Sequence, residues 1–198
     1  TKKCSTTPSI FFSGDTITND AAEDGAKALL RDVFGPTLGA LQSCDTNAPE
    51  CACQVKVSNR VSKYERAMAK IWLQCKKDAL TANGAFSPNG AVANADLEQC
   101  VTNVALTGGL SVAADTKGKI KKAKDQLTAT AAQFCAKGSA DEFVGGACAG
   151  FSAPPAPLDS AGLANCLTAH AKCRLCEMIN ETDVLAIDCD TWVGITCP

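Results

Sequence analysis

The sequence predicts a mostly helical domain held together by disulfides, and three observations lead to that prediction. The chain has 198 residues and 13 cysteines, a density typical of proteins that fold in an oxidising compartment. Hydrophobic residues make up 46% of it but aromatic residues only 5%, so small side chains must build much of the core. Several segments repeat apolar residues at helical spacing. We therefore expect one domain, residues 1–198, folded as a bundle of about five helices.

Both ends of the chain are expected to be extended. Residues 8–18 have the composition of a short strand and turn, and the tail from Val184 to Cys197 alternates apolar and polar residues. Between residue 18 and about Cys44, a helix capped by Asn19 or Asp20 is expected, with Gly35-Pro36 as a kink or break.

The clearest predicted helix spans about 54–79. Its apolar residues step by 4, 3, 4, 3 and 4, which places them on one buried face. They are Val57, Val61, Tyr64, Met68, Ile71 and Cys75, with Trp72 beside them. Most basic residues of this segment fall outside that face.

Three further helices are expected at about 93–106, 116–137 and 160–179, with loops at 83–90 and 145–157. The segments 95–105 and 161–171 are identical at five of eleven positions, including a cysteine. Each follows a basic helix that ends in a cysteine. We interpret this as a duplicated helical hairpin, residues 51–106 and 112–179.

The net charge is −2, which argues against a nucleic-acid partner, but the charge is unevenly distributed. Residues 1–50 carry −3, residues 51–137 carry +7 and residues 138–198 carry −6. Such alternation could orient subunits head to tail. The simpler interpretation is a pair of solvated lysine-rich helices between acidic ends.

All thirteen cysteines are candidates for disulfides, and an odd count leaves one for another chain, a ligand or a free thiol. The spacing of the cysteines does not give the connectivity of the disulfides. Cys51 and Cys53 are too close to pair comfortably, so they are expected to bond to two different partners. Cys4 and Cys44 are candidates for these partners. The candidates are Cys4, Cys44, Cys51, Cys53, Cys75, Cys100, Cys135, Cys148, Cys166, Cys173, Cys176, Cys189 and Cys197.

One cluster could bind a metal or carry redox chemistry. Cys166, His170, Cys173 and Cys176 share one face of a helix, and thiolates with an imidazole suit zinc or copper. The alternative, which we favour, is that each cysteine faces the core and pairs with a different helix while His170 packs beside them. No cofactor is therefore predicted.

The acidic tail is a second, weaker candidate for a cation site. Asp183, Asp188 and Asp190, with Asn180 and Glu181, could supply oxygen ligands to calcium, although a solvated tail is the favoured interpretation. Enzyme motifs are lacking: there is no G-x-S-x-G and no glycine-rich phosphate loop, and His170 is the single histidine. We predict no catalytic residues.

The sequence resembles a group of uncharacterised, cysteine-rich exported bacterial proteins. The resemblance lies in the C-terminal pattern CRLCEMINETDVLAIDCDTW followed by Cys197, and in the basic helix CQVKVSNRVSKYERAMAKIWLQC. After Trp192 the sequence departs from that pattern. The resemblance implies export and disulfides, and no activity.

The sequence therefore favours a secreted structural protein that assembles with itself, or with other extracellular proteins, into a filament or surface layer. It begins at Thr1, as a processed exported chain would, and has neither a signal peptide nor an apolar run long enough to span a membrane. Two alternatives remain open: a module that binds a lipid or other small apolar ligand, and the metal or redox protein described above.

Overall fold

A computed structural model describes residues 15–34, 48–80, 94–102, 117–135 and 160–197. In these ranges the chain forms helices and connecting turns, without strands, so the predicted disulfide-stapled helical bundle is confirmed. The helices are α1 (Asp15–Phe34), α2 (Ala48–Leu80), α3 (Asn94–Thr102), α5 (Lys119–Phe134), α7 (Ser160–Asp183) and α8 (Cys189–Val193).

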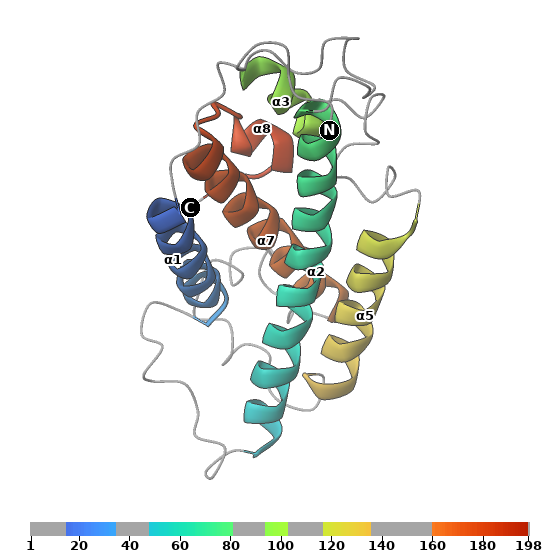
Figure 1. The fold of residues 1–198 in the computed structure, drawn as a ribbon. Coiled ribbons are helices and arrows are strands. Elements are labelled where there is room, and N and C mark those ends of the chain that lie inside the picture. The colour runs from blue at the N-terminus through green and yellow to red at the C-terminus, as the bar shows by residue number, and fades with distance from the viewer. Residues whose placement is uncertain (1–14, 35–47, 81–93, 103–116, 136–159, 198) are drawn as a thin grey trace.

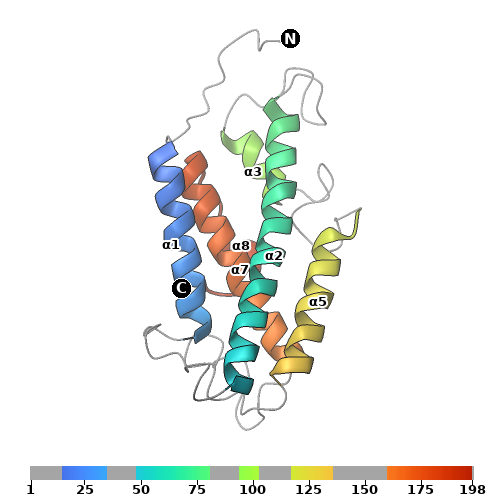
Figure 2. The same ribbon diagram turned by 60° about the horizontal axis from the view of Figure 1, so that its bottom comes forward.

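The long helix α2 organises the bundle. It packs against α5 along one side and crosses α7, which also packs on α5 (Figure 1). Helix α1 lies on the other side of α7, so α1 and α5 form opposite edges of the molecule in both views (Figure 2). The short helix α3 lies near the C-terminal end of α2, and the short helix α8 packs on α7.

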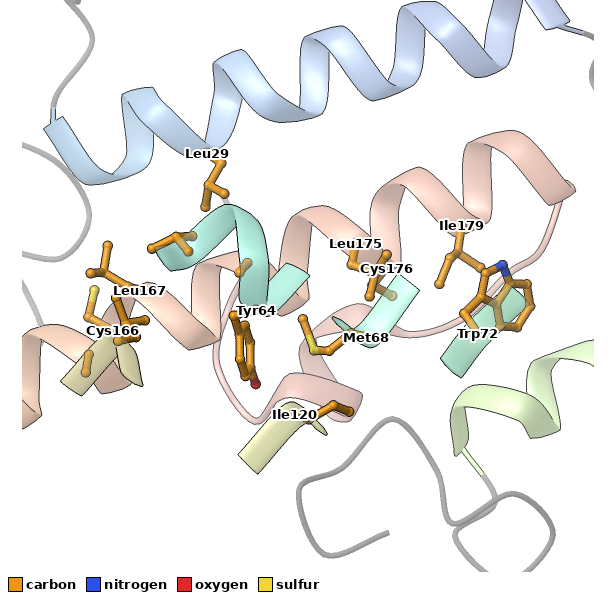
Figure 3. Close-up of a cluster of buried hydrophobic side chains, with 14 of the residues drawn as sticks. Leu29, Tyr64, Met68, Trp72, Ile120, Cys166, Leu167, Leu175, Cys176 and Ile179 are labelled. Atoms are coloured by element: carbon orange, nitrogen blue, oxygen red, sulfur yellow. The ribbon is translucent and has the colours of Figure 1, made fainter. Parts of the chain in front are cut away.

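The core is formed where α2, α5 and α7 meet, with Leu29 of α1 at its margin (Figure 3). The predicted stripe of α2 is buried, since Tyr64, Met68 and Trp72 are all at most 3% exposed. Ile120 of α5 and the α7 side chains of Leu167, Leu175 and Ile179 are fully buried against it. Burial also raises the pKa of Tyr64 to about 12, because ionisation would place a charge in this apolar environment.

Two disulfides hold the ends of α2. Cys53 near its start is bonded to Cys135 after α5, which makes the two helices antiparallel, and Cys75 near its end is bonded to Cys100 of α3. Cys51 is also disulfide-bonded, and since Cys53 has Cys135 as its partner, the two neighbouring cysteines diverge as predicted.

A polar contact supplements the packing of α2 on α5. The Arg60 guanidinium donates from Nε to Thr130 Oγ1 at 3.2 Å and from Nη1 to Gln126 Oε1 at 3.0 Å. Both acceptors are neutral, so the contact fixes the register of the two helices without neutralising the arginine.

The predicted extended segments need correction. Helix α1 begins at Asp15, so the last four residues of the 8–18 segment are helical, while the first seven lie outside the described residues. The C-terminal tail is not one strand: Leu185 to Asp188 lack regular structure, and α8 follows. Asp188 caps α8 by accepting from Thr191 N, and Gly194 ends it at φ 81°, where a side chain would be strained.

Helix α2 begins at Ala48, six residues before its predicted start, whereas its end agrees within one residue. The described part of α1 ends at Phe34, directly before Gly35-Pro36, and α7 continues to Asp183. The loops at 83–90 and 145–157 lie outside the described residues. The duplicated hairpins stay a prediction, and their cross-links differ: Cys75 is bonded to Cys100, whereas its counterpart Cys135 is bonded to Cys53 rather than to Cys166.

Candidate functional site

Helix α7 carries the cluster that the sequence singled out. Cys166, Cys173 and Cys176 are fully buried and His170 is 3% exposed, so the four side chains face the interior, as a helix with spacings of 4, 3 and 3 would place them. The structure thus brings the predicted cluster onto one buried helix face. What this face can do depends on the state of its sulfurs.

All three cysteine sulfurs of this face form disulfide bonds. Cys173 is bonded to Cys197, Cys176 is bonded to Cys189, and Cys166 is disulfide-bonded as well. A disulfide sulfur is not a thiolate, which is the form that binds zinc or copper. In the oxidised protein this face therefore presents no thiolate to a metal ion, and within the described residues no group of three or more histidine, cysteine and carboxylate side chains is placed to hold one.

The two C-terminal disulfides fold the tail back onto α7. After Asp183 the chain reverses at Val184, whose φ of 52° is unusual for a β-branched residue. Leu185 N then donates to the carbonyl oxygen of Asn180 at 3.1 Å, and the buried side chains of Leu185 and Ile187 pack into the core. The tail is therefore held by hydrogen bonds and apolar packing as well as by its two disulfides.

Asn180 is the residue that orders this reversal, a role that the sequence analysis missed. Its Nδ2 donates to Ile187 O at 2.9 Å, and its Oδ1 accepts from Ile187 N at 3.0 Å. The side-chain amide therefore satisfies both backbone groups of Ile187, as a neighbouring strand would. Asn180 could be interpreted from the sequence in two other ways. With Glu181 and Thr182 it forms a glycosylation sequon, and it was also a candidate ligand for a cation.

The three aspartates proposed as calcium ligands each have a separate structural partner, and Glu181 is exposed. Asp183 is buried and forms an ion pair with Lys76 of α2. Asp188 accepts from Thr191 N at 3.1 Å and from Thr191 Oγ1 at 2.7 Å, and these hydrogen bonds lower the pKa of its carboxyl. Asp190 Oδ1 accepts from Cys197 N at 2.7 Å. The carboxylates therefore stabilise the fold of the tail and do not converge on one point.

A groove between α1 and α2 is the remaining candidate for ligand binding. Its volume is about 190 Å³, and one carboxyl, that of Glu65, lies at it. Burial raises the pKa of Glu65, while the neighbouring Arg66 acts in the opposite direction. The lining residues are Ala26, Leu29, Leu30, Val57, Ser58, Asn59, Val61, Ser62 and Glu65.

Comparison with known proteins adds no assignment. No protein-family model matches the chain, and neither a curated protein nor a solved structure shows significant similarity to it. In the part of the chain that the structure describes, none of the helices has the length and apolar character needed to cross a membrane. The function must therefore be argued from the residues of this chain.

Proposed function

We propose that this chain is a secreted structural protein whose copies assemble into an extracellular filament or surface layer. The observation that supports this most is the state of its cysteines. All ten cysteines of the described residues are disulfide-bonded, whereas the chain has thirteen. Because an odd number cannot pair completely within one chain, at least one sulfur is available for another molecule, and it is not among these ten.

The distribution of the cross-links also supports a mechanical role. Disulfides fasten α2 to α5 and to α3, and they fasten the tail to α7, so the central helices are tied together at several points. Each such link restricts the unfolded chain and typically stabilises the fold by about 2–4 kcal/mol. A bundle of this kind keeps its shape without chaperones or a reducing environment, as an extracellular subunit must.

Assembly by donation of the C-terminal strand is not part of this proposal. To complete the sheet of a neighbour, residues 184–197 would have to be extended and free to leave their own chain. Their cysteines are instead bonded to α7 within the same chain, and α8 occupies the middle of the segment. We therefore assign assembly to helix surfaces and to an interchain disulfide.

The proposal is tested by measuring the molar mass of the native protein. Thiols are blocked before purification, and light scattering is recorded during size exclusion with and without mild reductant. We expect covalent dimers or larger particles that reductant converts towards the 20.4 kDa chain. A strictly monomeric particle carrying one alkylated cysteine would show that the odd sulfur joins no second chain, and the proposal would fail.

The groove beside Glu65 supports a second candidate, a module that binds a small apolar ligand. Its lining is formed largely by aliphatic side chains with one carboxyl, but about 190 Å³ is below the roughly 300–1,000 Å³ of typical ligand pockets. The groove suits a fragment such as a short acyl end or a single ring. Native mass spectrometry of the purified protein distinguishes this candidate, because a retained small molecule is expected only if the groove is a binding site.

A further inference from the structure

Four exposed lysines form a regular row along α2. Lys56, Lys63, Lys70 and Lys77 are spaced by seven residues, and all four are exposed. Seven residues are close to two helical turns, with a drift of only about 20° per step, so the four side chains lie on one line along the helix. At 1.5 Å per residue the row is roughly 31 Å long. We call these four residues the lysine row.

Helix α5 extends the positive surface beside this row. Lys119 and Lys122 are exposed and lie seven and four residues before Gln126, so they share its helix face. Gln126 contacts Arg60 of α2, which places that face on the side of α5 next to α2. Because the helices are antiparallel, Lys70 comes level with the start of α5, the end that carries Lys119.

Little in the described structure neutralises this surface. Helices α2 and α5 together contain eleven basic and four acidic residues. No ion pair in the described residues involves Lys63, Lys70 or Lys122. Arg60 contacts neutral groups. Lys56 Nζ lies 5.9 Å from the ring centroid of Phe134. The chain as a whole is weakly acidic, so this charge is local and is not a consequence of overall composition.

We propose that the lysine row, with Lys119 and Lys122, binds a linear acidic polysaccharide. A row of exposed ammonium groups suits a polymer with anionic groups along its length, and lysine, a point charge on a flexible stem, tolerates variation in their spacing better than a bidentate arginine does. The disulfides are typical of a compartment where the available polyanions are polysaccharides rather than nucleic acids.

A second copy of this chain fits the row less well. The exposed charges of α1 are mixed, with Asp20, Glu23 and Asp24 followed by Lys27 and Arg31, and Glu23 is paired with Lys27. The exposed acids near the C-terminus, among them Glu181 and Asp188, lie around a chain reversal rather than along a line. No described element therefore presents an acidic row complementary to the lysine row.

Salt-gradient elution of the native protein from immobilised heparin and from immobilised polygalacturonate tests the proposal. The double variant Lys63→Gln with Lys70→Gln removes two charges of the row. The matched control, Lys27→Gln with Arg31→Gln, removes two exposed charges from α1 at the opposite edge. All substituted side chains are exposed, so circular dichroism should be unchanged.

We expect the wild type and the control to bind, and the row variant to elute at lower salt. Its affinity at 50 mM salt should fall about tenfold, with a shallower dependence on salt because fewer counterions are released. Equal losses in both variants would mean non-specific attraction and overturn the proposal. A wild type that passes through both columns, but whose self-association is lost in the row variant, would reassign the row to contacts between copies and would also overturn it.

Discussion

The side-chain amide of Asn180 binds the backbone of Ile187 in both directions, with Nδ2 donating to Ile187 O at 2.9 Å and Oδ1 accepting from Ile187 N at 3.0 Å. This pair joins the last turn of α7 to the returning tail, between the chain reversal at Val184 and the Cys176–Cys189 disulfide. It explains how a segment with few helical hydrogen bonds can be ordered against the core.

Replacement of Asn180 by alanine should destabilise the protein by about 2 kcal/mol. The substitution leaves the N–H and C=O of the buried Ile187 without their partner, and two such groups together cost about that much. Urea unfolding checks this prediction. Asn165→Ala, at an exposed position of the same helix, is the control and should change stability by less than about 0.5 kcal/mol. Similar losses in both variants would contradict the assigned role.

The disulfides should stabilise the fold by different amounts, according to the length of the loop that each one closes. Cys53–Cys135 spans 82 residues and Cys176–Cys189 spans 13. The chain-entropy model gives about 4–5 kcal/mol for the first and about 3 kcal/mol for the second. Denaturant unfolding of the two paired Cys→Ser variants measures this order. The reverse order would show that packing around the sulfurs, rather than loop closure, determines their contribution.

The ion pair between Lys76 and Asp183 should respond asymmetrically to substitution. Asp183 is the more buried partner, with a side chain 4% exposed against 21% for Lys76. Lys76→Met leaves a buried carboxylate without a counter-charge and should lower the free energy of unfolding by about 3 kcal/mol. Asp183→Asn leaves a lysine that can reach water and should lower it by about 1 kcal/mol. Thermal unfolding compares the two, with the exposed Lys77→Met as a control.

Glu65 should destabilise the protein at neutral pH. Burial raises its pKa in the folded state, so the folded chain holds its proton more tightly than the unfolded chain does. Stability contributed by this group is therefore present below the unfolded pKa of about 4.5 and falls as the pH rises through the folded value. Glu65→Gln should raise the melting temperature at pH 7 and leave it nearly unchanged at pH 4. An equal effect at both pH values would contradict the assigned burial.

Sequence periodicity predicted the framework well but the tail poorly. The 4-3-4-3-4 spacing from Val57 to Cys75 identified the buried face of α2. A long amphipathic helix repeats its apolar spacing over many turns, and each repeat indicates the same face. In the tail, alternation predicted one extended segment, whereas only Leu185 to Asp188 lack helical structure before α8 begins. It did not reveal the helix start at Asp188 or its end at Gly194, since a five-residue helix depends on its caps and not on periodicity.

The candidate site was predicted in part. Cys173 and Cys176 do not bridge each other, as expected, because two residues three apart on a helix cannot pair comfortably. The expectation that each pairs with a different helix was wrong for Cys173, because Cys197 lies in the tail beyond α8. Their partners, Cys197 and Cys189, could not be identified, because connectivity depends on how the tail returns. That return is set by Asn180, whose contact seven residues away has no distinctive sequence signal.

Disulfide mapping of the native, thiol-blocked protein by non-reducing peptide mass spectrometry tests the central claim most directly. We predict the linked peptides Cys53–Cys135, Cys75–Cys100, Cys173–Cys197 and Cys176–Cys189, together with one linked peptide that can arise only between two chains. Alkylated Cys173 and Cys176, or a thirteenth cysteine recovered only as a blocked thiol, would contradict the account of a stapled, self-assembling subunit.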